Sequence, residues 1–148
     1  MDNKILLSKR TSRIVELAKE ASREYGQGYV GTEHLLLGIV REGTSMAAKM
    51  LAELGATEQK VQEVVDELVK ERLQETWVMG RLPGTPHFKD VLAKAAAKSR
   101  GSGNWQVRSV HLLDALLRES NSTGQRALAK LGLSADSVRG HAHRVTAE

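Results

Sequence analysis

The sequence predicts an all-α protein in which two tandem four-helix repeats pack with pseudo-two-fold symmetry into one globular domain. The 148-residue chain is 41% hydrophobic but only 3% aromatic, so Leu, Val and Ala must build its core. Apolar residues recur at helical spacing throughout, which indicates amphipathic helices. A segment that begins at Val30 recurs 77 residues later at Val107, and Gly55 recurs at the same offset as Gly132. These observations indicate a duplicated helical unit.

The first repeat, about residues 8–74, is predicted to hold four helices. Each begins at a hydroxyl residue that can accept a hydrogen bond from the first helical turn. The predicted caps are Ser8, Thr32, Ser45 and Thr57. The second helix, over about residues 33–42, is apolar on nearly every face and should therefore lie at the centre of the fold. Glycines are predicted to end the first three helices, at Gly26 and Gly28, Gly43, and Gly55.

A connector is predicted over residues 75–84, where two glycines and a proline break the helical pattern. Within it, the apolar residues Trp77, Val78 and Met79 either pack back on the domain or form an exposed contact, and packing back is favoured because an exposed Trp is uncommon. The second repeat, about residues 85–146, begins where Thr85 and Pro86 supply a cap and a proline at the first helical position. Its further predicted caps are Ser109, Ser122 and Ser134.

The composition excludes several classes of protein. The chain has no cysteine, so it has neither a disulfide framework nor thiolate chemistry, and a cytoplasmic location is the simplest interpretation. No apolar run approaches the roughly 20 residues of a membrane-spanning helix. The apolar part of the N-terminus is also too short for a signal peptide. We therefore expect no membrane association.

Charge is unevenly distributed along the chain. Residues 1–75 hold 11 Lys or Arg and 13 Asp or Glu, whereas residues 76–148 hold 11 and 5. The basic half leaves a helical nucleic-acid-binding protein open as an alternative function. The basic residues are scattered, however, and they form no stripe interleaved with aromatic residues. We interpret them as a solvated helical surface and expect no nucleic-acid partner.

One motif carries a family resemblance. Residues 31–38 read Gly-Thr-Glu-His-Leu-Leu-Leu-Gly, residues 41–43 read Arg-Glu-Gly and residues 54–55 read Leu-Gly. This pattern resembles the Clp N-terminal repeat domain, the front domain of Clp-type AAA+ unfoldases, and is most similar to the ClpC branch. The resemblance covers nearly the whole chain. The second repeat departs from it at Arg108, Val110 and Ala115, where the family has Gly, Glu and Gly.

The resemblance implies a non-enzymatic module that docks substrate proteins and adaptor proteins for Clp ATPase and protease components. In the ClpC branch it also implies binding of phosphorylated arginine and of cyclic peptides. No Gly-x-x-x-x-Gly-Lys-(Ser/Thr) loop is present, which agrees with a domain that lacks its own ATPase. Either the chain belongs to a larger unfoldase, or it is a stand-alone copy that acts as an adaptor or as a ligand-sequestering decoy. We expect a monomer in isolation.

The resemblance implies one ligand site in the first repeat, formed by Glu33 with Ser8, Arg10 and Thr32. With Thr32 as the cap, Glu33 is expected at the first helical position, where it faces solvent at the positive end of the helix dipole. A carboxylate there can accept a bidentate guanidinium, or it can simply favour the start of its own helix. Ser8 and Arg10 can meet a phosphate, although both are equally explained as a cap and a surface residue.

Other polar residues point to no further site. Val110 cannot hold a guanidinium and His87 stands where the family has Arg, so a second ligand site is expected to be absent. His34 and His111 are interpreted as packing and helix-start residues. His141 and His143 lie two residues apart, on different faces of a helix, which disfavours a metal site. No catalytic residue, metal or cofactor is expected.

Overall fold

The computed structural model describes residues 7–26, 30–79, 87–101, 106–118, 123–134 and 136–138, with side chains except at 71–79, 87–90 and 101. The helices are α1 (Lys9–Glu24), α2 (Thr32–Glu42), α3 (Met46–Glu53), α4 (Glu58–Met79), α5 (His87–Gly101), α6 (Ser109–Arg118) and α7 (Thr123–Lys130). Residues 136–138 are also helical. Outside the helices, Leu7 and Val107 form an isolated parallel bridge. The predicted all-α class is confirmed.

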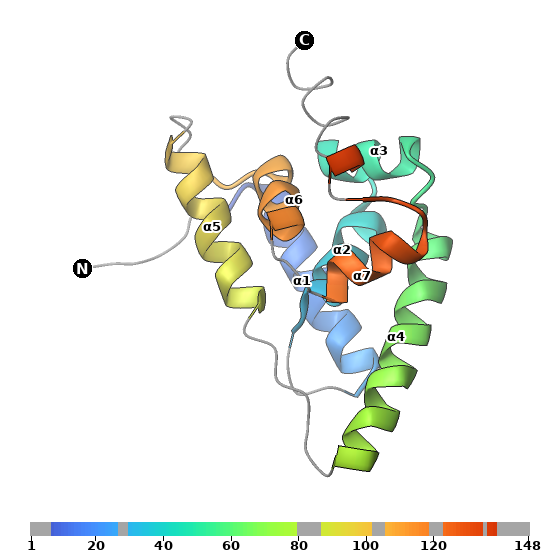
Figure 1. The fold of residues 1–148 in the computed structure, drawn as a ribbon. Helices are drawn as coiled ribbons and strands as arrows, with labels where there is room; N and C mark the ends of the chain where they lie inside the picture. Colours follow the sequence, from blue (N-terminus) through green and yellow to red (C-terminus); the bar gives the residue numbers. More distant parts are fainter. Residues whose placement is uncertain are drawn as a thin grey trace, which may run out of the picture.

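The apolar helix α2 lies at the centre of the fold, as predicted (Figure 1). It contacts α1, α3, α4, α5 and α7. Its four large aliphatic residues that are fully buried are Leu35, Leu36, Leu37 and Ile39. In the second repeat, α6 contributes the equivalent group of Leu112, Leu113, Leu116 and Leu117. The two leucine-rich helices therefore supply the middle of one shared core.

Gly38, in the middle of α2, permits close packing against α1. A Cβ atom at Gly38 would lie 2.4 Å from the carbonyl oxygen of Ile14 and 3.2 Å from the amide nitrogen of Ala18. These are backbone atoms, so relieving the clash would require one helix to move away from the other. The equivalent position in α6 holds Ala115.

Most of the predicted helix caps in the first repeat are confirmed. The hydroxyl oxygens of Ser8, Ser45 and Thr57 accept hydrogen bonds from amides three residues further on, at 3.2, 3.2 and 3.3 Å. Gly43, Gly55 and Gly132 follow helix ends with φ of 74°, 91° and 81°, the left-handed conformation that glycine adopts without strain. In the second repeat, Ser134 accepts from the amide of Ser137 at 3.1 Å.

Two predicted caps are wrong by one residue. Thr32 and Ser109 are the first residues of α2 and α6, not the residues before them. The N-cap of α2 is Gly31. The hydroxyls of Thr32 and Ser109 instead serve the other repeat. Thr32 Oγ1 accepts from the amide of Gly124 in α7 at 2.8 Å, and Ser109 Oγ accepts from the amide of Ala47 in α3 at 3.2 Å.

These two bonds are related by the same offset of 77 residues, and they express the predicted pseudo-two-fold symmetry. Gly124 and Ala47 each occupy the second position of their helices, where an amide has no acceptor inside its own helix. Each repeat thus caps a helix of the other. The repeats are therefore interlocked in one domain, and not two separate bundles.

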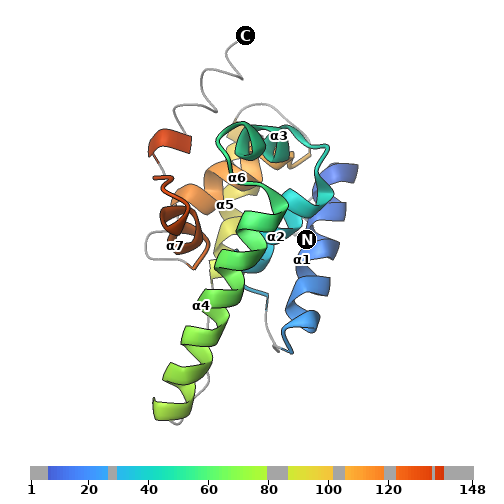
Figure 2. The same cartoon turned by 90° about the vertical axis from the view of Figure 1, so that its right-hand side faces the viewer.

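The predicted connector begins inside a helix. α4 continues to Met79, because no glycine or proline interrupts the chain before Gly80. The last turns of α4 extend beyond the neighbouring helices (Figures 1 and 2). The rest of the connector, the side chain of Trp77, the caps predicted at Thr85 and Ser122, and most of the predicted eighth helix lie outside the described parts of the chain.

Candidate functional site

The first turns of α2 and α6 form two equivalent structures, which we call the α2 mouth (residues 31–34) and the α6 mouth (residues 108–111). In the α2 mouth, His34 Nδ1 accepts a hydrogen bond from the amide of Gly31 at 2.8 Å. In the α6 mouth, His111 Nδ1 accepts from the amide of Arg108 at 3.0 Å. Each imidazole takes the place that Glu or Gln occupies in a capping box. The interpretation of both histidines as helix-start residues is confirmed.

Glu33 occupies the second position of α2, and it is buried. Only 1% of its surface is exposed, and both carboxylate oxygens are covered. The side chain lies over Gly31, where a Cβ atom would be 1.8 Å from Glu33 Oε1. The expectation that Glu33 faces solvent is therefore wrong, because the missing side chain of Gly31 leaves a space that the carboxylate fills. Oε1 is also 4.0 Å from His34 Nδ1.

Thr32, the second residue predicted for this site, joins α2 to α7. It is 1% exposed, and its hydroxyl oxygen accepts a hydrogen bond from the backbone amide of Gly124. A Cβ atom at Gly124 would lie 3.1 Å from Thr32 Cβ, so the contact is tight and leaves no room for a larger residue in α7. Thr32 is thus adjacent to Glu33 and fixes the α2 mouth against the second repeat.

Ser8 and Arg10 lie elsewhere, beside the α6 mouth. The amide of Ser8 donates to the carbonyl oxygen of Val107 at 2.9 Å, and Arg10 follows two residues later in an exposed position. The other end of α1 reaches the α2 mouth, because the rings of Tyr25 and His34 are 6.0 Å apart. The 16 residues of α1 span about 24 Å between these ends. The structure therefore does not bring Ser8 and Arg10 together with Glu33.

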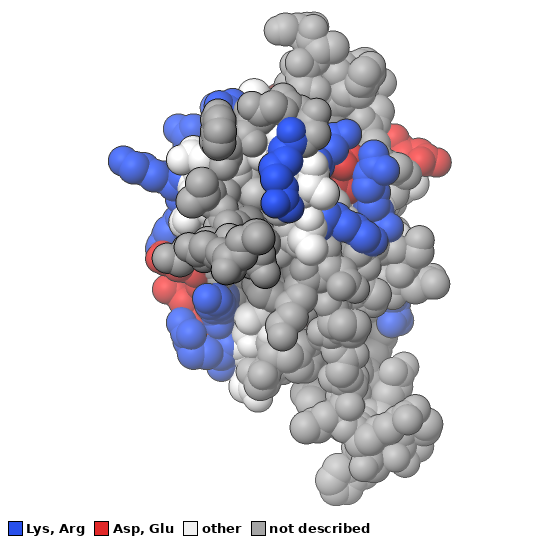
Figure 3. Space-filling model, turned by 90° about the vertical axis from the view of Figure 1, so that its left-hand side faces the viewer, with Lys and Arg blue, Asp and Glu red and all other residues white. Residues whose placement is uncertain are grey.

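The α6 mouth carries the opposite charge to the α2 mouth. Half-buried Val110 replaces Glu33, and exposed Arg108 replaces Gly31. Burial lowers the pKa of His111, and the charges of Arg108 and Lys98 lower it further, against a weaker opposing effect of Asp114. Figure 3 shows the side of the molecule on which α5 lies in Figure 1, with Lys and Arg side chains spread across the face and acidic ones mainly toward its edges.

A polar network that sequence reasoning missed holds the end of α1 near the α2 mouth. Tyr25 donates its hydroxyl proton to Asp66 and accepts from Gln62 Nε2 at 2.6 Å. Arg41 donates to Gln62 Oε1 at 2.7 Å and pairs with Glu24 at 2.5 Å. Burial, followed by the hydrogen bond to Asp66, raises the pKa of Tyr25 above its ordinary value. The network links α1, α2 and α4, and helical spacing alone does not reveal it.

Within the described ranges, no group of three or more His, Asp or Glu residues could hold a metal ion. Within the same ranges, no helix combines the length and apolar character needed to cross a membrane. His141 and His143 lie outside these ranges.

Two interlocked copies of one helical repeat, each with a histidine-capped mouth, define a class of tandem-repeat helical domain. The chain belongs to the family described as the Clp repeat (R) N-terminal domain, whose model matches residues 6–91 and again residues 83–148. The resemblance seen in the sequence is thereby confirmed. The two matches also confirm the tandem duplication.

Curated relatives are similar to nearly all of this chain. It is 36% identical over 132 residues to the "Negative regulator of genetic competence ClpC/MecB" of Bacillus subtilis (strain 168), covering 89% of this chain and 16% of that protein. It is 32% identical over 141 residues to "Chaperone protein ClpC1, chloroplastic" of Arabidopsis thaliana, covering 95% and 15%. The chain therefore spans about one sixth of the length of these relatives.

A solved structure shares the fold. The N-terminal domain of the caseinolytic protease associated chaperone ClpD from Arabidopsis thaliana matches with a TM-score of 0.76, and the match covers 100% of both chains. The sequence identity is 17%, so this likeness supports the architecture alone.

Proposed function

We propose that this chain is a non-enzymatic module that docks substrate and adaptor proteins for a Clp ATPase and its protease. Support comes from the family match in both repeats and from curated relatives that carry Clp names. Purified protein should then show neither ATPase nor peptidase activity by itself. An activity that persists through further purification steps would argue against a docking role.

We further propose that the α2 mouth binds phosphoarginine-marked proteins, with cyclic peptides as a second ligand class. The observation that carries this proposal is the carboxylate of Glu33, which stands where the resembling family has its guanidinium-binding glutamate. A carboxylate can accept two parallel hydrogen bonds from a guanidinium group. Because Glu33 is 1% exposed, its side chain must turn outward from Gly31 when the ligand binds.

Calorimetric titration with free phosphoarginine tests this proposal. The wild-type chain should bind with a stoichiometry of one, because Val110 supplies no carboxylate at the α6 mouth. Glu33→Gln keeps the volume of the side chain and removes its charge. Loss of one partner of a desolvated charge pair costs about 2–5 kcal/mol, so affinity should fall more than tenfold.

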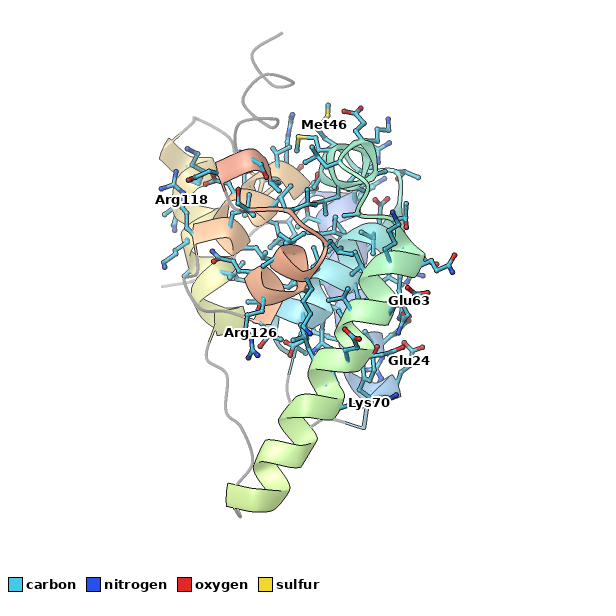
Figure 4. The ribbon with its side chains drawn as sticks, turned by 45° about the vertical axis from the view of Figure 1, so that its right-hand side comes forward. Glu24, Met46, Glu63, Lys70, Arg118 and Arg126 are labelled. Carbon is cyan, nitrogen blue, oxygen red and sulfur yellow. The ribbon has the colours of Figure 1, made fainter. Side chains whose placement is uncertain are left out.

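Glu63→Gln is the matched control, because Glu63 is exposed on the outer side of α4 (Figure 4). It should leave phosphoarginine affinity unchanged. Thermal melting of both variants separates lost binding from lost folding, which matters because Glu33 is buried. Undiminished binding by folded Glu33→Gln, or two equal sites in the wild type, would contradict the proposal.

A further inference from the structure

We infer that the basic surface around the α6 mouth docks an acidic, Asp- or Glu-rich segment of a partner protein. The surface is defined by Arg108, Lys98 and Arg10. This inference extends the proposed docking function to a second site, and it makes no use of Glu33. It assigns the second repeat a ligand of opposite charge to the guanidinium proposed for the first.

The three side chains come from three different elements that meet at one place. Arg108 immediately precedes α6, Lys98 lies in α5, and both act electrostatically on the same imidazole of His111. Arg10 follows Ser8, whose amide is bonded to the carbonyl of Val107, one residue before Arg108. All three side chains are exposed. The fold therefore gathers positive charge that is scattered over about 100 residues of sequence.

Two differences between the mouths create this charge. At the α2 mouth, Gly31 and Glu33 contribute one negative charge, whereas Arg108 and Val110 contribute one positive charge at the α6 mouth. An acidic residue near the α6 mouth forms an ion pair within its own helix. Asp114, one turn further along α6, pairs with Arg118 at 2.9 Å. This pairing offsets part of the repulsion between Asp114 and an anionic partner.

The chemistry favours an acidic protein segment over nucleic acid. Proteins that bind single strands stack bases on aromatic side chains beside the basic groove. Among the described residues, this surface is defined by Arg108, Lys98 and Arg10, and the neighbouring Val110 has no π face.

Fluorescence anisotropy with a labelled ten-residue peptide of alternating glutamate and glycine tests the inference on the full chain. Arg108→Gln and Lys98→Gln should each raise Kd about threefold, and together roughly tenfold, which is the scale of exposed charge pairs. Val110→Glu should weaken binding to a similar degree by placing a carboxylate in the mouth. The matched control replaces two exposed lysines of the first repeat, Lys49→Gln and Lys60→Gln, and should change Kd less than twofold.

Three outcomes would overturn the inference: no binding of the peptide by the folded wild-type chain, equal weakening by the control pair, or tighter binding of an oligothymidylate of the same charge. The last would assign the surface to nucleic acid. Phosphoarginine titration of the Arg108→Gln variant separates this inference from the proposed function. If this variant binds phosphoarginine but the wild type does not bind the peptide, only the inferred α6 site is contradicted. If the wild type binds the peptide but not phosphoarginine, only the proposed α2 site is contradicted.

Discussion

The α2 and α6 mouths share one backbone design and differ in what they present to a ligand. Both keep a histidine that bonds the amide three residues before it, and both keep a hydroxyl that caps the opposite repeat. The other two positions of each mouth, the N-cap and the second helical position, both differ between the repeats. Glu33 fills the space over Gly31, so the position of its carboxylate depends on glycine at the N-cap. Val110 imposes no such requirement, and Arg108 is accommodated.

Within one helical turn, the residues that hold each mouth in place are therefore separable from the residues that set its charge. Hydroxyl and imidazole groups hold the mouth in place, while the N-cap and the second helical position set its charge. Substitutions that exchange residues between the mouths, or between the helices behind them, should therefore follow the repeat symmetry.

The helix pair behind each mouth is packed differently, at Gly38 in α2 and Ala115 in α6. Gly38→Ala should destabilise the chain by about 3 kcal/mol, because its Cβ would meet the backbone of Ile14 at 2.4 Å. Urea unfolding followed by circular dichroism measures this change. Ala115→Gly is the reciprocal control and should cost about 1 kcal/mol through lost helix propensity. A Gly38→Ala variant as stable as the wild type would show that α1 and α2 do not need this close approach.

The coupling between Gly31 and Glu33 can be measured by a double-mutant cycle. Gly31→Ala should displace the carboxylate and cost about 1–2 kcal/mol of stability, the scale of moderate overpacking. In a Glu33→Val background the same change should be nearly neutral, since the side chain that it meets is shorter. The difference gives the coupling energy directly. Equal costs in both backgrounds would mean that Glu33 does not lie over Gly31.

The two cross-repeat caps should be interchangeable. One contact pairs Thr32 with Gly124, and the other pairs Ser109 with Ala47. Each pair therefore contains one methyl group, on the hydroxyl residue in the first and on the amide residue in the second. Gly124→Ala alone should cost about 1 kcal/mol, because its Cβ would lie 3.1 Å from Thr32. Adding Thr32→Ser copies the Ser109–Ala47 contact and should recover this loss within about 0.5 kcal/mol. Additive losses in the double variant would contradict the symmetry.

The smallest effect concerns pH. The pKa of His111 is lowered in the folded chain, while the unfolded chain titrates near the ordinary value of about 6.5. The unfolded state therefore binds more protons as pH falls below that value, and stability should decline with it. The groups that face His111 are Arg108 and Lys98, which oppose its protonation, and Asp114, which favours it. In His111→Gln, the side-chain amide oxygen can still accept a hydrogen bond from the backbone amide of Arg108. The unfolding free energy of this variant should decline less between pH 7.5 and 5.5 than that of the wild type.

Much of the fold follows from local patterns, because helical spacing and the offset of 77 residues are visible in the chain itself. Ser8 and Ser45 cap their own helices as local spacing predicts. Thr32 and Ser109 do not, since their partners lie 92 and 62 residues away. Local spacing identifies a residue that can cap, but it does not identify which helix receives the bond.

The candidate site was predicted in part. The motif located Glu33 at the start of α2, but its burial depends on the space over Gly31, which no sequence pattern reports. The family resemblance implied a site in which Ser8 and Arg10 lie together with Glu33. The bond from Ser8 to Val107 places them with the second repeat instead. Tertiary packing decides which repeat the start of α1 lies against, and a local motif does not report it.

The central proposal is that the α2 mouth binds the guanidinium group of phosphoarginine, whereas the α6 mouth binds the carboxylates of an acidic segment. Amide chemical-shift mapping by two-dimensional NMR tests it directly, with phosphoarginine titrated into one sample and the glutamate–glycine peptide into another. We predict that phosphoarginine shifts the amides of residues 31–34 and Gly124. The peptide should shift those of Lys98 and residues 108–111. Shifts at the same mouth for both ligands would contradict the account.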